Sequence, residues 1–461
     1  MNREYCKLTT AIKLTKHTLD KHLNSEELEN LNKKLQIENA VFFYQLASKF
    51  NLSDINITAF RHIECCFSMI AETESFLESD FLTVSKILAS FSLQIDSEVE
   101  VYSAADNWLN RNIEERSRFA KQLLLKARLN LLSKQTLEYL LSQSSCISKN
   151  DDCVELLNKK EFFHQNESSV RNKSRQCNHN VFNVLICGGY DTKEKKITNQ
   201  VKEFDRRNLK NLPPMSENRN NSKAVYIRGE VYVFGGFNKD GFITSVEKYS
   251  PGFKKWAKVT TIPDKRQNFC TCAFMNSIYL FGGTYLGPGY LKFCLRLDAK
   301  SLSWKNVAKM NVEKAFAACA TYEGNIVVSG GRGNNLNVLN AVESYNVFAE
   351  TWASMPSMIS SRTGHSLVSV KSKLLAIGGL SNTQSCEIFD KTSSVFVTLE
   401  APNCLSRMIV GTALIGNTVL VFQSETKVVL CFNVDNNLWS EESCEATGSI
   451  CGYSSVKAFF K

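Results

Sequence analysis

The sequence predicts an α + all-β protein of two domains, with helices in the N-terminal third and a repetitive β-domain after them. The β-domain is indicated by glycine doublets that recur at steps of 47, 47, 48 and 48 residues. The helices are indicated by apolar residues at helical spacing between residues 35 and 165. A chain of 461 residues has room for both domains. The doublets are Gly188-Gly189, Gly235-Gly236, Gly282-Gly283, Gly330-Gly331 and Gly378-Gly379.

Each doublet ends a short apolar run, which predicts a buried strand. Glycine suits this position because the chain must leave the strand sharply, often at positive φ, beside a neighbouring backbone. A period of this length predicts a supersecondary unit that buries its faces only by stacking against copies of itself. The runs are Val184–Cys187, Val231–Phe234, Ile278–Phe281, Ile326–Ser329 and Leu374–Ile377.

The rest of each unit repeats as well. Trp256, Trp304 and Trp352 follow their doublets by 20 or 21 residues. A basic residue precedes each later apolar run, and a sixth, degenerate copy runs from Val419 to Phe422 with Trp439 after it. The basic residues are Arg219, Arg266, Lys314, Arg362 and Arg407. These units resemble kelch repeats over residues 181–461, and the resemblance implies a β-propeller of six four-stranded blades.

The first unit begins at its glycine strand and has no strand before it. Residues 452–460, at the end of the chain, have the pattern of that missing strand. We therefore expect the C-terminus to complete blade one, so that no long sheet edge stays open.

The N-terminal segments resemble, in order, the BACK domain that precedes the propeller in kelch-like proteins. Ser97 and Glu100 have the form of a capping box and open a helix that carries Trp108. The expected domains are residues 1–34 as a remnant of the last helices of a BTB domain, 35–165 as the BACK domain, 166–180 as a linker and 181–461 as the propeller.

Kelch-like proteins normally begin with a full BTB domain, which dimerises and docks a cullin. Only 34 residues precede the BACK region here. We therefore expect a mainly monomeric chain that binds cullin weakly or not at all, with the first BACK helices as the remaining cullin contact.

Composition and charge restrict the function further. No apolar stretch approaches the length of a membrane span, which predicts a cytoplasmic protein, with the nucleus as the alternative. Residues 1–180 carry 23 basic and 24 acidic side chains, whereas residues 181–461 carry 32 and 22. The propeller's surplus of positive charge favours acidic protein partners. Nucleic acid is not expected, because there is no run of Lys and Arg and no aromatic platform.

No catalytic constellation is visible, so the chain is not expected to be an enzyme or to bind a cofactor or metal. Copper oxidases with kelch-type repeats need several histidine ligands, and His365 is the only histidine in residues 181–461. The resemblance implies instead a substrate-recognition adaptor of a cullin-3 RING ubiquitin ligase. The alternatives are an actin-binding or cytoskeletal scaffold and a BTB-less competitor of a full-length kelch-like protein.

In kelch-like proteins, ligands lie across the loops at the mouth of the ring, at and just after the basic residue of each repeat. The expected partner-binding residues are Arg219, Asn220, Asn221, Arg266, Gln267, Asn268, Phe316, Arg362, Thr363 and Arg407. The arginines favour an acidic segment as ligand, because a guanidinium meets a carboxylate with two bonds. A second interpretation is that the arginines tie neighbouring blades together, and the sequence leaves both interpretations open.

Overall fold

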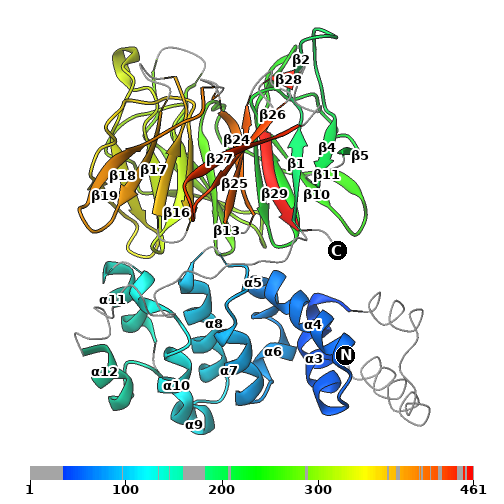
Figure 1. Cartoon of the computed structure of the whole chain (residues 1–461), viewed down its shortest axis with the longest axis vertical. Coiled ribbons are helices and arrows are strands. Elements are labelled where there is room, and N and C mark those ends of the chain that lie inside the picture. Colours follow the sequence, from blue (N-terminus) through cyan, green and yellow to red (C-terminus); the bar gives the residue numbers. More distant parts are fainter. Residues whose placement is uncertain are drawn as a thin grey trace.

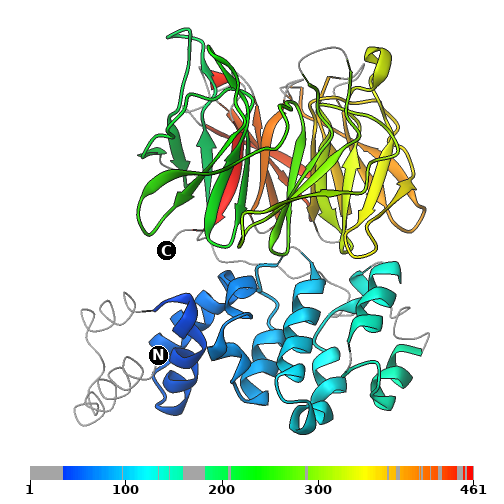
Figure 2. The same ribbon diagram turned by 180° about the vertical axis from the view of Figure 1, so that it is seen from behind.

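The computed structural model shows a helical domain lying against one end of a six-bladed propeller (Figures 1 and 2). It describes residues 35–95, 97–132, 134–144, 146–158, 182–205, 209–285, 289–370, 373–380, 385–403, 405, 409–415, 417–423, 428–443, 450–451 and 454–459. The expected BTB remnant (1–34) and linker (166–180) lie outside these residues.

The helical domain is a stack of short helices. None of the described helices is long and apolar enough to cross a membrane. The helices are η1 (Ile37–Asn39), α3 (Ala40–Lys49), α4 (Ser53–Cys65), α5 (Phe67–Ile70), α6 (Glu74–Leu77), α7 (Phe81–Ala89), α8 (Glu98–Asn110), α9 (Ile113–Arg116), η2 (Ser117–Phe119), α10 (Ala120–Leu124), η3 (Leu129–Leu131), α11 (Lys134–Gln143) and α12 (Asp151–Asn158).

The capping box predicted at Ser97 is confirmed, since its hydroxyl accepts from the start of α8 and Glu100 accepts from the Ser97 N–H at 3.3 Å. This fixes where α8 begins and therefore which face it buries. Trp108, on that face, is buried and donates its indole N–H to the Ser79 carbonyl at 2.9 Å.

The propeller consists of six four-stranded antiparallel sheets. From the innermost strand outward, blade 1 has β29 (Ser454–Phe459), β1 (Phe182–Cys187), β4 (Val201–Phe204) and β5 (Leu209–Leu212). Blade 2 has β6 (Lys223–Ile227), β7 (Glu230–Phe234), β10 (Ser245–Ser250) and β11 (Lys255–Thr261). Blade 3 has β12 (Cys270–Phe274), β13 (Ser277–Phe281), β14 (Cys294–Asp298) and β15 (Trp304–Val307).

Blade 4 has β16 (Ala318–Tyr322), β17 (Asn325–Ser329), β18 (Val342–Asn346) and β19 (Thr351–Met355). Blade 5 has β20 (Ser366–Val370), β21 (Lys373–Ile377), β22 (Cys386–Asp390) and β23 (Val395–Leu399). Blade 6 has β24 (Ile409–Ile415), β25 (Thr418–Gln423), β26 (Val428–Asn433) and β27 (Leu438–Ser443). Short pairs add β2 (Tyr190–Asp191), β3 (Lys196–Ile197), β28 (Ile450–Cys451), β8 (Phe237–Asn238) and β9 (Gly241–Phe242).

The predicted closure of the ring is confirmed. Strand β29 pairs with β1 in antiparallel register from Phe182 opposite Phe459 to Cys187 opposite Ser454. The C-terminal strand is therefore the innermost strand of blade 1, and the two ends of the propeller sequence are joined in one sheet.

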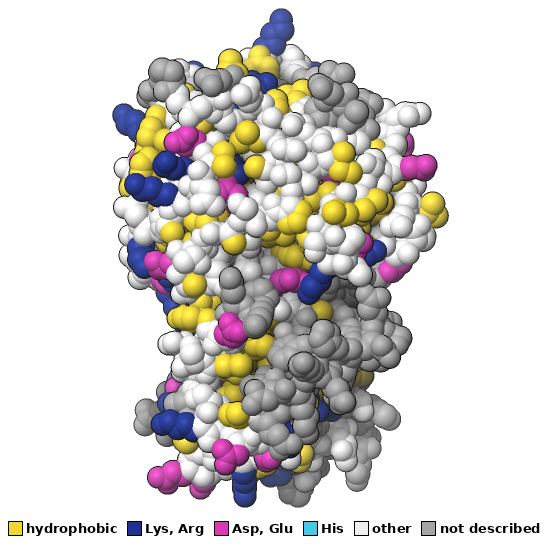
Figure 3. Space-filling view, turned by 90° about the vertical axis from the view of Figure 1, so that its left-hand side faces the viewer, with side chains coloured by type: hydrophobic (Ala, Val, Ile, Leu, Met, Phe, Trp, Pro, Cys, Tyr) yellow, Lys and Arg dark blue, Asp and Glu magenta, His cyan; other side chains and the backbone are white. Residues whose placement is uncertain are grey.

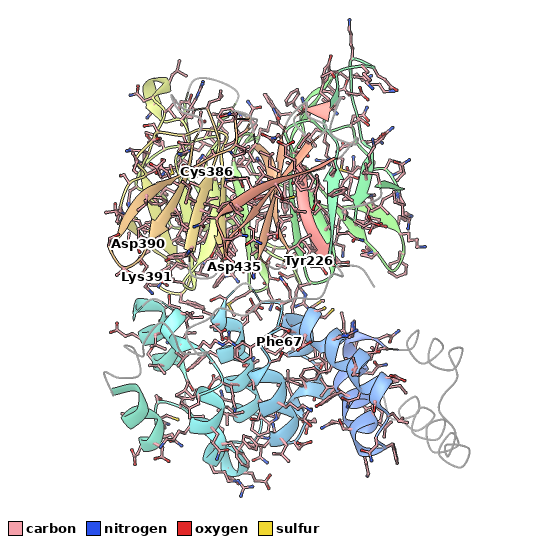
Figure 4. All side chains as sticks on the ribbon, in the orientation of Figure 1. Phe67, Tyr226, Cys386, Asp390, Lys391 and Asp435 are labelled. Atoms are coloured by element: carbon pink, nitrogen blue, oxygen red, sulfur yellow. The ribbon has the colours of Figure 1, made fainter. Side chains whose placement is uncertain are left out.

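The helical domain and the propeller share an apolar core. One cluster of buried side chains includes Phe67 and Trp108 from the helices and Phe274 and Tyr345 from blades 3 and 4. The turns that follow the innermost strands, and those that follow the third strands, face the helices. Tyr226, Asp390 and Lys391 mark this end of the propeller in Figure 4.

Glu72 is the polar centre of this interface. Its carboxylate accepts from Arg228 at 3.1 Å and Lys300 at 2.6 Å, and also from the Asn276 amide. Burial alone raises the pKa of Glu72, but these bonds outweigh burial and the pKa is lowered. A carboxyl with a lowered pKa stabilises the folded protein above its unfolded pKa, and this stabilisation is lost as the pH falls through the folded pKa.

Glu72→Gln should therefore destabilise the protein by about 1–2 kcal/mol near neutral pH, since it removes charge-assisted bonds that are only partly screened by solvent. Thermal denaturation of both proteins across the acidic range checks this. The difference should shrink as the pH falls and Glu72 becomes protonated in the parent. A difference that stays constant with pH would contradict an ionic role for Glu72.

Deleting residues 454–461 should open blade 1 and destabilise the protein by more than about 4 kcal/mol, because β1 and the neighbouring innermost strands lose their packing. Circular dichroism melts of the truncated chain measure this, and a synthetic peptide of residues 450–461 should restore part of the lost stability. A truncated chain that melts at the parent temperature would show that β29 is dispensable.

Candidate functional site

The end of the propeller away from the helices is formed by two sets of loops. One set precedes the innermost strands and contains the repeated basic residue, and the other follows the glycine doublets. Isolated β-bridges join the two sets: Asn220 with Phe237, Gln267 with Thr284, Ala315 with Arg332, and Thr363 with Leu380. Those predicted partner-binding residues that the structure describes thus lie on loops at one end of the propeller.

The basic side chains do not reach this face. Arg219, Arg266 and Arg362 are at most 2% exposed. Each donates from Nη1 to the carbonyl of the first glycine of its own blade, at 2.8 Å to Gly235, 3.2 Å to Gly282 and 2.9 Å to Gly378. The side chain therefore ties the loop to the second strand of the same blade.

A buried carboxylate on the third strand completes the tie. Glu247 pairs with Arg219 at 2.9 Å, Glu343 with Lys314 at 2.6 Å and Glu387 with Arg362 at 2.8 Å. The two groups of each pair are almost free of solvent contact, so each charge depends on its partner.

Blade 3 lacks the acid on its third strand, where Leu295 stands at the equivalent position. Asp264, two residues before Arg266 on the same loop, accepts from the guanidinium instead, with Nε to Oδ1 at 2.6 Å. The charge balance of the buried arginine is therefore kept by a different residue.

The backbone of the basic residue holds the neighbouring blade. The N–H of the second glycine of one blade donates to the carbonyl of the basic residue of the next, at 2.7 Å from Gly189 to Arg219 and 2.7 Å from Gly331 to Arg362. The first glycine has no room for a side chain, since a Cβ on Gly330 (φ +59°) would lie 2.5 Å from the Arg362 carbonyl oxygen. The same close approach to the carbonyl of a basic residue occurs at Gly188 and Gly282, and it explains the first glycine in blades 1, 3 and 4.

These positions correct part of the predicted site. The side chains of Arg219, Arg266, Arg362 and Thr363 are buried, so they cannot contact a partner on the intact propeller. The interpretation of the arginines as structural ties is the one that the geometry supports. Arg407 lies outside the described residues.

The residue two positions after each basic residue lies at the mouth of the central channel. Asn221, Asn268, Phe316 and Gly364, which we call the mouth ring, all have left-handed backbone angles (φ 53°, 58°, 54° and 66°). Backbone bonds link successive members: Phe316 N–H donates to Asn268 at 2.8 Å and Gly364 N–H to Phe316 at 2.9 Å. Asn221 is exposed, and Asn220, Gln267 and Asn268 are half-buried at the same face.

Phe316 differs from the other members of the ring. A bulky residue at positive φ is strained, and such strain is typical of functional positions. As a residue, Phe316 is 40% exposed. Leu336 and Leu380, on the glycine loops of blades 4 and 5, are also exposed, so apolar groups lie on these blades and amides on blades 2 and 3. Sequence reasoning missed both leucines, although Leu380 directly follows a doublet.

His365 lies beside this ring but is a structural residue. It is buried, and its Nε2 lies 2.8 Å from the Ser329 hydroxyl. Burial, followed by the charges of Arg362 and Lys314, lowers its pKa to about 3, so it is neutral at physiological pH. Among the described residues, no group of His, Cys, Asp and Glu is arranged to hold a metal ion.

Arg362→Ala should destabilise the propeller by about 3–5 kcal/mol, because it leaves Glu387 buried without a partner. Chemical denaturation of the intact chain measures the loss. Lys265→Ala, at an exposed position beside another basic residue of the repeats, is the matched control and should change stability little. Equal stabilities of the Arg362 variant and the parent would mean that the guanidinium is not a tie.

Comparisons with known proteins agree with this architecture. The family model described as "BTB And C-terminal Kelch" (BACK) matches residues 40–142, and that described as "KLHDC2/KLHL20/DRC7 Kelch-repeats domain" matches residues 173–379. Kelch-like protein 7 of Mus musculus is 25% identical over 430 residues, which are 90% of this chain and 72% of the relative.

Two human proteins are also similar. Kelch-like protein 7 of Homo sapiens is 26% identical over 76% of this chain and 60% of its own length. Kelch-like protein 11 of Homo sapiens is 24% identical over 57% of this chain and 39% of its own length. With a BACK domain followed by a propeller of kelch repeats, the chain belongs to the family of kelch-like proteins.

Proposed function

We propose that the chain is a substrate-recognition adaptor of a cullin-3 RING ubiquitin ligase, and that the mouth ring and its loops bind the target. The observation that carries this proposal is that the two ends of the propeller differ in what covers them. The helical domain packs on one end, and the described helices leave the other end, with its strained aromatic residue, open (Figure 1).

The target is proposed to be an acidic protein segment with an apolar anchor. Phe316 supplies the apolar contact, and Asn220, Asn221, Gln267 and Asn268 supply amides that can bond to a peptide backbone. The acidic preference rests on the propeller's positive surplus, because the arginines of the repeats are used inside the protein. On the face shown in Figure 3, Lys and Arg side chains are scattered and do not form one patch. Scattered positive charges would speed the encounter with an acidic target, but they would not provide a fixed ion pair in the complex.

The cullin is proposed to bind at the first BACK helices, α3 and α4, which lie at the opposite end of the helical domain from α11 and α12 (Figure 1). Affinity purification of the chain with quantitation of cullin-3, followed by ubiquitin transfer to a captured target, tests the function. Capture of targets without cullin-3 would favour the competitor alternative. Co-sedimentation with actin filaments, without cullin-3 capture, would favour the scaffold alternative.

Phe316→Gly should weaken target capture by at least about tenfold while the melting temperature stays the same or rises, because glycine relieves the positive φ. Phe253→Gly is the matched control, since Phe253 is 87% exposed on a turn at the other end of the propeller. Quantitative mass spectrometry of proteins captured by the parent and both variants measures the effect. Targets retained equally by all three proteins would remove Phe316 from the site.

A further inference from the structure

The six innermost strands surround a central channel with a cavity of about 400 Å³. Its lining comes from β6, β12, β16, β20, β24 and β29, together with Gln94 of the helical domain. Gln94 borders the end at the helices, and the mouth ring lies above the other end. The cavity is therefore a pocket beneath the proposed target-binding face.

A regular register places pairs of side chains across the seams between blades. Positions are counted from the basic residue of each repeat. The residue at position +4 of one blade faces the residue at position +5 of the next blade. In blades 5 and 6 this pair is Ser366 and Thr412, whose hydroxyls are 2.7 Å apart. In blades 3 and 4 these positions are held by Cys270 and Cys319, which both line the channel. In blades 2 and 3, the same two positions are held by Lys223 and Thr271.

Lys223 is the exception among these channel residues because it carries a charge. Glu343 balances the charge of the buried Lys314 at 2.6 Å, whereas no Asp or Glu is among the described residues that line the channel. We propose that the channel contains an anion-binding site centred on Lys223 and Thr271, which takes a carboxylate or another small oxyanion. The ammonium and the hydroxyl would both donate to the oxyanion.

The energetics of Lys223 fit such a site. Lys223 is half-buried at the channel wall, and no carboxylate among the described channel residues balances its charge. Desolvation therefore lowers the pKa of Lys223, and the thiols of Cys270 and Cys319 offset this only in part. Cys272 and His365 also line the channel, and His365 is neutral because its pKa is about 3. A bound anion favours the charged amine, so binding takes up a proton and should weaken as the pH rises.

The oxyanion has two sources. It can be a free small anion, or it can be an Asp or Glu side chain of a target that enters through the mouth ring. The second source rests on the proposed function and deepens it. In that case Lys223, and not the buried arginines, is the cation that contacts the acidic side chain of the target. The first source is independent of target binding.

The test uses the full chain with inorganic phosphate and acetate as probes, at constant ionic strength set with chloride. Both probes should raise the melting temperature of the parent and of Lys265→Met, which removes an exposed lysine outside the channel. Lys223→Met should be at least as stable as the parent without probe and should lose the shift. Lys223→Gln gives the same comparison if the first variant folds poorly. Equal shifts in parent and Lys223 variants, or no shift in the parent, would overturn the site.

A peptide arm distinguishes the two sources. A capped Gly-Gly-Glu-Gly-Gly peptide and its Gln analogue are titrated into the parent and Lys223→Met by calorimetry. Binding of the Glu peptide alone, lost in the variant, supports a target side chain as the occupant. Phosphate binding without peptide binding supports a free anion. Target capture that survives Lys223→Met leaves the proposed function intact, so the two ideas fail separately.

Discussion

A buried basic side chain in front of an innermost strand is the constraint on which the ring depends. In blades 2, 4 and 5 its charge is balanced by a glutamate on the third strand, and in blade 3 by Asp264 on the loop itself. Its side chain links the loop before the innermost strand to the second and third strands of the same blade. Its backbone carbonyl accepts a hydrogen bond from the second glycine of the preceding blade. One residue therefore fixes the conformation within a blade and the spacing between blades. In blades 1, 3 and 4 the first glycine of the doublet is required because this contact leaves no room for a Cβ.

This constraint also shapes the proposed binding face. Guanidiniums that are fully bonded inside the blades cannot serve a ligand, so the face is left with amides, exposed leucines and the strained Phe316. The helical domain occupies the opposite end through a shared apolar core and the ion pairs of Glu72. In the proposed function, one end of the propeller would hold a target and the helical domain at the other end would hold the rest of a complex.

Much of the fold could be predicted from the sequence because its signals are local or periodic. The doublets, the three tryptophans and the capping box at Ser97 each lie within one repeat or one helix turn, and the closing strand followed from an unpaired first unit. The burial of the arginines could not be predicted, because it depends on sheet register. Arg219 meets Glu247 across 28 residues, and the same residue types would be equally consistent with a ligand site.

The docking of the two domains and the channel site could not be predicted for a related reason. Arg228 reaches Glu72 across 156 residues, and nothing in the sequence around either residue marks the pair. Lys223 looks like any polar residue that begins a strand, and only the arrangement of six blades shows that it lines a central channel. Asn221, Asn268 and Phe316 of the mouth ring were predicted as contacts by position, but the strain at Phe316 is visible only in the backbone angles.

A double-mutant cycle on Arg219 and Glu247 tests the central claim most directly. The unfolding free energies of Arg219→Met, Glu247→Met and the double variant are measured by chemical denaturation of the full chain. If the pair is a buried tie, each single change is strongly destabilising and the double change costs clearly less than their sum, because neither charge is left alone. If each single change lowered the unfolding free energy by less than about 0.5 kcal/mol and the two effects were additive, the claim would be contradicted. Arg219 would then be a candidate for binding a partner.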